Sequence, residues 1–291
     1  MTTSLHSREF ETGRYEARHP AEVLTGCRVT NRGEDWATAE MMLPRIASGQ
    51  TVPLGWLGIL ADSVAAQSLG RLFAQGLDVR TVDLRLDAVG PVPSPGAVAT
   101  AQGELISSDH RTGLSRVRIH GPNDVTVAVG TARFIVVPGQ PPPSLSAPLG
   151  MTLVPPAGVP GFPPLDEVFG IKGSVRQGDS LTLTAELPPA LCNKHGVVHG
   201  GLHVSLIDHA MRTLVGRPGV LCEAATPELL DLTVVYQRPI LPAVEGTVLI
   251  RATIERRGRR IITVNSAVQT PEGRVMTSAQ GTFLSATEDR P

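Results

Sequence analysis

The chain has 291 residues, of which 41% are hydrophobic and 18% charged, and its formal net charge is −1. This length suits one large or two ordinary domains, and the near-neutral charge argues against nucleic acid as a partner. No apolar run is long enough to span a membrane, the cysteines follow no metal or disulfide spacing, and the charged N-terminus does not resemble a secretory signal, so we expect a cytoplasmic protein without a membrane partner.

The first part of the chain alternates strands with one long helix. Residues 1–20 are predicted to form an N-terminal extension. From Glu22 onward the pattern suits strands, with turn residues at 29–33 and a strand at 36–43. An amphipathic helix over 55–75 follows and carries Asp62. The period-2 pattern then predicts four more strands, which cover residues 79–89, 97–106, 114–120 and 125–137.

A proline-rich segment at 138–164 holds ten of the 25 prolines and is predicted to be an extended linker. The same order of elements returns after it. A strand at 180–187 precedes a helix that begins near His199. Further strands are predicted near residues 229–237, 247–256, 260–269 and 274–285.

Matching letters at a constant spacing indicate that the chain contains an internal repeat. Asp62 and Asp208 are 146 residues apart, and the tripeptide Thr-Ala-Glu recurs at 38–40 and 184–186 with the same spacing. Together with the repeated element order and the central linker, this predicts two similar α+β units at 21–137 and 165–291.

The richest stretch in polar and glycine residues is Asn193-Lys-His-Gly-Val-Val-His-Gly-Gly201, at the start of the second predicted helix. A helix start offers unpaired backbone N–H groups and a partial positive charge. Gly200 and Gly201 let a substrate oxygen approach that backbone closely, and Asn193 and His199 add side-chain donors. The stretch is therefore a candidate cradle for a carbonyl that gains negative charge during a reaction.

The pattern Asn-x-x-Gly-x-x-His-Gly-Gly, followed by Asp208 within the helix, resembles the signature of hotdog-fold acyl-CoA thioesterases of the phenylacetate-pathway (PaaI) type. In that family an antiparallel sheet wraps around a long central helix. Combined with the internal repeat, the resemblance implies two hotdog units packed as a pseudo-dimer, the tandem form of the fold. Such proteins commonly assemble further, so we also expect a homo-oligomer.

In families of this kind the active site is shared between two units, which implies a cross-unit site here. Asn193, His199 and Gly200 of the second unit would face Asp62 of the first, and Thr81 takes the place of the family's Ser or Thr on the following strand. The second groove would hold Asp208 with Leu229 and no cradle, because Pro53 stands opposite His199 when the two helices are aligned. Asp208 is kept as a candidate catalytic residue of that weaker groove.

The resemblance implies hydrolysis of an acyl-CoA thioester, with coenzyme A as part of the substrate and no separate cofactor. Asp62 would activate a water as general base or attack as a nucleophile, and the sequence leaves this choice open. The helix start would stabilise the oxyanion. Candidate contacts to coenzyme A are Gly201 and the basic turn at Arg257, Arg259 and Arg260, since guanidinium groups suit phosphate.

Other readings remain open at this point. His195, His199, His203 and His209 invite a metal site, but no carboxylate or cysteine set completes one, so none is predicted. A hotdog enoyl-thioester hydratase would be expected to show Gly-Asp-x-Asn-Pro, which is absent. The acyl-CoA thioesterase II family uses Asp, Thr and Gln, of which Gln280 is a faint counterpart. A non-catalytic acyl-CoA-binding module is the fourth possibility, and the acyl group and its carrier stay open.

Overall fold

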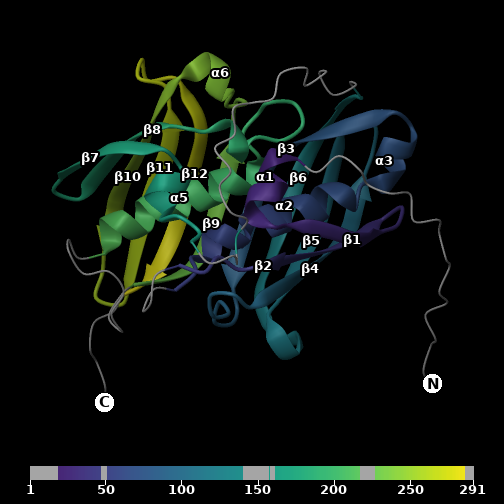
Figure 1. Cartoon of the computed structure of the whole chain (residues 1–291), viewed down its shortest axis with the longest axis horizontal. Helices are drawn as coiled ribbons and strands as arrows, with labels where there is room; N and C mark the ends of the chain where they lie inside the picture. Colours follow the sequence, from purple (N-terminus) through teal and green to yellow (C-terminus); the bar gives the residue numbers. More distant parts are fainter. Residues whose placement is uncertain (1–18, 47–50, 140–156, 158–160, 217–226, 286–291) are drawn as a thin grey trace.

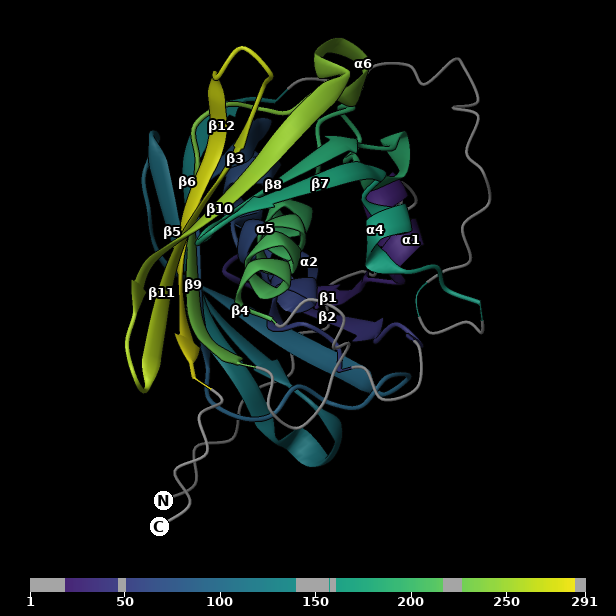
Figure 2. The ribbon, with the colours of Figure 1, turned by 90° about the vertical axis from the view of Figure 1, so that its left-hand side faces the viewer.

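The computed structural model describes residues 19–46, 51–139, 157, 161–216 and 227–285. A single antiparallel sheet wraps around two central helices, α2 and α5 (Figure 1 and Figure 2). No helix within these ranges is long and apolar enough to cross a membrane.

Each half of the chain contributes six strands and one principal helix. The first half contains α1 (Pro20–Thr25), β1 (Arg28–Arg32), β2 (Trp36–Met42), the 3-10 turn η1 (Leu54–Leu57), α2 (Gly58–Gln67), α3 (Gly70–Ala74), β3 (Leu77–Ala88), β4 (Val98–Ser108), β5 (Thr112–His120), η2 (Pro122–Asp124) and β6 (Thr126–Pro138). The second contains α4 (Leu165–Val168), β7 (Ile171–Gln177), β8 (Ser180–Glu186), η3 (Pro189–Leu191), α5 (Gly200–Val215), β9 (Glu228–Tyr236), α6 (Pro242–Glu245), β10 (Thr247–Arg257), β11 (Ile261–Gln269) and β12 (Val275–Leu284).

The strand order shows that the two halves are copies of one another. The sheet runs β1-β2-β4-β5-β6-β3-β9-β12-β11-β10-β8-β7, so each half repeats the same order outward from the central β3–β9 pair. Arg85 pairs with Thr233 at that junction, with Leu86 opposite Leu232 and Leu84 opposite Val234. Because the repeat offset in these strands is 148 residues, Arg85 and Thr233 are counterparts, and a pseudo-twofold axis passes between them.

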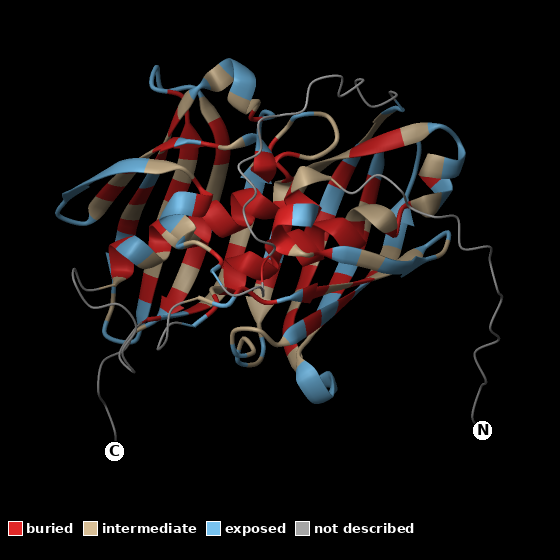
Figure 3. Cartoon of the chain, viewed as in Figure 1, coloured by how far each residue is buried: buried red, intermediate tan, exposed pale blue. Residues whose placement is uncertain are grey.

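The strands form because alternate side chains are apolar. In β8 Leu181, Leu183 and Ala185 are buried, while the threonines between them are half-buried. The same alternation along the other strands turns one face of the sheet toward the helices, as the buried bands in Figure 3 show.

Glycines set how closely the two central helices approach. A Cβ on Gly201 would lie 2.2 Å from the Cα of Ile59 and 2.3 Å from the carbonyl oxygen of Gly58. A Cβ on Gly58 would meet the Val204 side chain at 2.6 Å. The backbones of α2 and α5 therefore touch at this crossing, which brings residues of one unit to the helix start of the other.

Most predicted elements are confirmed, but three predictions were wrong. The expected turn at 29–33 is edge strand β1, which pairs with β2, and the segment 22–25, expected to suit a strand, lies in α1. The helix expected over 55–75 is broken at Ser68, whose hydroxyl donates to the Ala65 carbonyl and contacts Ser115. Strand β7 was missed. The predicted extension and linker fall mostly on residues outside the described ranges.

Candidate active site

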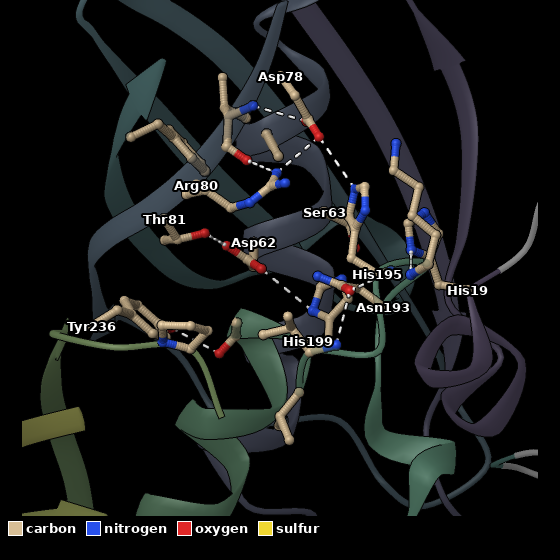
Figure 4. A pocket seen from close by; sticks show the side chains of 18 of the residues that line it. His19, Asp62, Ser63, Asp78, Arg80, Thr81, Asn193, His195, His199 and Tyr236 are labelled. Carbon is tan, nitrogen blue, oxygen red and sulfur yellow. Dashed lines mark hydrogen bonds and ion pairs between the residues drawn. The ribbon is translucent and has the colours of Figure 1, made fainter. Parts of the chain in front are cut away.

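A cavity of about 590 Å³ lies where the two units meet (Figure 4). The first unit contributes α2, the start of β3 and part of β6, and the second contributes the loop before α5 and the end of β9. The lining includes the apolar side chains of Ala66, Phe73, Val79 and Phe134. It also carries carboxylate and imidazole groups, so the cavity suits a molecule with an apolar and a polar part.

Asp62 is one of the polar residues of the lining and lies between Thr81 and His199 (Figure 4). The Thr81 hydroxyl donates to its Oδ1 at 2.9 Å, and the Gly201 N–H donates to its Oδ2 at 3.1 Å. These two bonds, one from each unit, fix the direction of a carboxylate that is only 5% exposed. Asp62, Thr81, His199 and Gly200, which the sequence placed in one cross-unit site, do lie together. Gly201, predicted as a contact to coenzyme A, donates its N–H to Asp62, and its contact with coenzyme A stays a prediction.

His199 is the N-cap of α5, and its Nδ1 lies close to a backbone N–H group and to the Asp62 carboxylate. The Gly201 N–H also donates to Nδ1 of His199 at 3.2 Å, while Nδ1 and the Asp62 Oδ2 are 3.3 Å apart. Because Nδ1 accepts a hydrogen bond, we assign the proton of the neutral ring to Nε2. The ring therefore has a donor available on the side away from Asp62.

The turn before His199 explains the spacing of Asn and Gly in the sequence. The Oδ1 of Asn193 accepts hydrogen bonds from the N–H groups of His195 at 2.9 Å and Val197 at 3.4 Å. Gly196 has a φ of 72°, a left-handed conformation that other residues rarely adopt. Since the oxygen of Asn193 is used within the turn, its NH2 group is the part that remains for the cavity.

Gly200 is the first residue of α5, and Asp62 packs directly against it. A Cβ at this position would lie 2.6 Å from the Asp62 Oδ2, so only glycine fits. The Tyr236 hydroxyl donates to the Gly200 carbonyl at 2.8 Å. Burial raises the pKa of Tyr236 well above its usual value, and the negative charges of Asp62 and Asp83 add to this, so the phenol stays protonated.

His203 lies one turn further along α5 and is 2% exposed. Its Nδ1 is 2.7 Å from the Thr277 hydroxyl, and its ring packs against Tyr236 with centroids 5.3 Å apart. Burial lowers the pKa of His203 to about 4, and the neighbouring His199 lowers it further. His203 is therefore a neutral ring beneath the helix start.

A second polar group lines the cavity beside the loop that precedes α5. Nε2 of His195 lies 3.3 Å from the Asp78 Oδ2, and Arg80 pairs with the same carboxylate at 2.8 Å. Burial opposes ionisation of Asp78, but hydrogen bonds from Arg80 and the Val79 N–H outweigh it and lower the pKa. Burial lowers the pKa of His195, and the positive charges of Arg80 and Lys194 lower it further. Because Asp78 belongs to the first unit and His195 to the second, their contact also joins the two units.

Asp208 has the equivalent backbone contact but does not line the cavity. Its Oδ2 accepts from the Gly55 N–H at 2.7 Å, as Asp62 accepts from Gly201, and Gly55 is the counterpart of Gly201 in the repeat. Its Oδ1 accepts from Nε of Arg212 at 2.8 Å, and Asp208 is 0% exposed. Arg212 therefore covers the carboxylate, whereas its counterpart beside Asp62 is the small Ala66.

Several predicted binding residues lie outside the cavity lining. Arg257, Arg259 and Arg260 are not part of it, and Arg257 instead faces Asp179 at 3.5 Å. Their contact with coenzyme A stays a prediction. Gln280 is exposed on β12 and bonds to Asn265. Cations do line the cavity, but they are Arg32, Arg80, Lys194 and Arg238.

Sequence reasoning missed most of the groups that surround the central carboxylate. Tyr236, Asp78 and Arg80 belong to no spacing pattern, because they lie on strands that only the fold brings next to α5. His203 was noticed only as a possible metal ligand. Among the described residues, no group of three or more His, Cys, Asp and Glu side chains is arranged to hold a metal ion.

Comparison with known proteins agrees with this architecture. Residues 195–277 match the family model of the thioesterase superfamily, a span that includes His199, Gly200 and Asp208. The chain has no sequence match among curated proteins.

Solved structures match along nearly the whole chain. A tesB protein from Mycobacterium avium subs paratuberculosis has a TM-score of 0.64 at 10% identity and covers 91% of this chain and 98% of its own. An acyl-CoA thioesterase II, TesB2, from Mycobacterium marinum has a TM-score of 0.57 at 12% identity, and the match covers 94% of this chain and 99% of the other. A putative oleoyl thioesterase from Lactobacillus plantarum has a TM-score of 0.59 at 11% identity, and the match covers 88% of this chain and 97% of the other.

The predicted fold, two hotdog units packed as a pseudo-dimer, is confirmed by these structural matches. The superfamily match likewise confirms the predicted resemblance to hotdog thioesterases and agrees with the predicted class, a thioester hydrolase. The PaaI-type subgroup and the homo-oligomer stay predictions.

Proposed function

We propose that the protein hydrolyses acyl-CoA thioesters at a single site built from both units, with Asp62 as general base. The observation that carries this proposal is the position of Asp62, a buried carboxylate from one unit bonded to the helix start of the other. The superfamily match of the second unit and the thioesterases with the same fold support the reaction class.

The start of α5 is suited to polarise the thioester carbonyl. The Gly200 N–H has no acceptor within its own helix, and the helix dipole adds partial positive charge. The Nε2–H of His199 and the NH2 of Asn193 are side-chain donors beside it. Fixed donors of this kind stabilise the oxyanion of the tetrahedral intermediate, and one such donor contributes about 10²–10³ in rate.

Asp62 is placed to activate the attacking water. The carboxylate takes a proton from the water as its oxygen forms a bond to the thioester carbon, which gives the tetrahedral oxyanion. Collapse of this intermediate breaks the carbon–sulfur bond, and the proton on Asp62 passes to the leaving sulfur. The products are a carboxylic acid and free coenzyme A. The Thr81 hydroxyl holds Oδ1 and so determines which carboxylate oxygen faces the water.

The apolar part of the cavity lining is the place for the acyl group. It includes Phe73 and Phe134 of the first unit and Ala66 of α2. The second groove would not turn over substrate. There Arg212, the counterpart of Ala66 in the repeat, fills the space beside the carboxylate and pairs with Asp208. We assign Asp208 a structural role.

Hydrolysis of a panel of short, aromatic and long acyl-CoA thioesters by wild type, Asp62→Asn and Asp208→Asn tests the proposal. We expect Asp62→Asn to lose about 10²–10⁴ in kcat, and Asp208→Asn to lose mainly thermal stability. Equal losses of kcat in the two variants would refute the single-site assignment. Hydration of an enoyl-CoA without hydrolysis would instead favour the hydratase, and binding without turnover would favour a non-catalytic module.

A further inference from the structure

The short helix α1 crosses from the first unit to the loop that carries Asn193. Figure 2 shows α1 on the side of α2 and α5 that faces away from the central strands. The Ala21 N–H donates to the Cys192 carbonyl at 3.0 Å. The Lys194 N–H donates to Nδ1 of His19 at 2.9 Å. Two hydrogen bonds of opposite direction thus join α1 and its N-cap residue, His19, to the loop.

These two bonds lie on either side of Asn193. Cys192 and Lys194 are its chain neighbours, and each is bonded to α1 through a backbone group. The turn that the Asn193 side chain organises begins at this point and reaches Val197, two residues before His199. Any movement of α1 would therefore shift the residues that supply side-chain donors to the site.

His19 also forms part of the cavity wall, where Figure 4 shows it beside Asn193 and on the opposite side from Tyr236. Its ring lies edge-on to that of His199, with centroids 6.4 Å apart and planes at 84°. Because Nδ1 of His19 accepts a hydrogen bond, the proton of the neutral ring is on Nε2.

The groups around His19 favour the neutral form of its imidazole ring. Burial lowers the pKa of His19 to about 4, with further lowering by His199, Lys194 and His195, while Asp78 acts in the opposite direction. A protonated ring would lose the acceptor that holds the Lys194 N–H. The loop contact therefore persists at neutral pH.

We propose that His19 is a positioning residue of the active site, which holds the loop at Asn193 through its Nδ1 and so keeps Asn193 and His199 aimed at the thioester carbonyl. This inference rests on the proposed function. It extends the site to the segment that precedes the first hotdog unit. The corresponding short helix of the second unit, α4, makes a different contact, from Asp166 to His209 at 2.6 Å.

Three variants separate the acceptor from the bulk of the ring. His19→Asn keeps an acceptor oxygen at the same number of bonds from the backbone as Nδ1, whereas His19→Leu fills the space without one. Val23→Thr, on the exposed side of the same helix, is the matched control. We expect His19→Leu to lower kcat about tenfold with a smaller change in KM, because misplacement of donors affects the transition state most. His19→Asn should stay within about threefold of wild type.

Equal effects of the Asn and Leu variants, whether both are fully active or both are inactive, would overturn the proposal. A second measurement does not depend on catalysis. Nitrogen-15 NMR of labelled histidine should show His19 as the neutral tautomer with the proton on Nε2 at pH 7. A protonated ring, or a proton on Nδ1, would overturn the proposal even if the wild type hydrolyses thioesters. If the wild type hydrolyses none, the proposed function fails while this result still decides the tautomer.

Discussion

Stability in acid should depend strongly on His203. The ring is 2% exposed, and its pKa is about 4 in the folded protein against 6.5 for an ordinary histidine. Between these values the unfolded chain binds a proton that the folded protein does not, so stability falls as pH falls. A gap of about 2.5 pH units at about 1.4 kcal/mol per unit gives a loss of about 3 kcal/mol in unfolding free energy between pH 7 and pH 4.

Urea unfolding of wild type and His203→Gln at several pH values between 7.5 and 4.5 measures this effect. Any change in the contact with Thr277 affects the variant equally at every pH, but its stability should fall less steeply in acid than that of wild type. The exposed His110→Gln is the matched control for the chemical change. If the wild-type and His203→Gln curves stay parallel over this range, the reasoning about the buried neutral ring is wrong.

Two further predictions concern the close crossing of the two helices and the buried carboxylate of Asp208. Gly201→Ala should lower the unfolding free energy by about 3 kcal/mol or more, because its Cβ would overlap the Ile59 backbone, whereas Gly173→Ala, with no atom within 4 Å, should stay within about 0.5 kcal/mol. Equal urea midpoints would contradict the close helix crossing. Arg212→Leu should cost about 3–5 kcal/mol by leaving Asp208 buried without its charge partner. Arg116→Leu, which breaks an exposed pair with Glu104, should cost under about 1 kcal/mol, and thermal melts that rank the two the other way would refute this.

The repeat and the helix-start pattern predicted most of the fold and the centre of the site. Asp62 and Asp208 occupy counterpart positions, and each accepts a hydrogen bond from the glycine at the start of the other unit's helix region. This reciprocity follows from two similar units around a twofold axis, so a constant offset in the sequence was enough to anticipate it.

The surroundings of that centre could not be predicted, for identifiable reasons. His19, Asp78 and Tyr236 come from three separate elements, and no local spacing links them to the loop at Asn193. The first helix breaks at Ser68, whose hydroxyl contacts Ser115, and these residues are 47 apart in sequence. The pairing of Arg212 with Asp208 could have been predicted from the sequence, because residues i and i+4 lie on the same side of a helix.

The most direct test of a single site shared by both units is a double-mutant cycle between Asp62 and His199. Asp62→Asn should lower kcat by about 10²–10⁴ and His199→Ala by about 10²–10³. Because Nδ1 of His199 lies 3.3 Å from the Asp62 carboxylate, the double variant should be slower by clearly less than the product of the two single losses. If the two losses multiply in full, Asp62 and His199 are not coupled, and the proposed contact between them across the two units in the working enzyme is wrong.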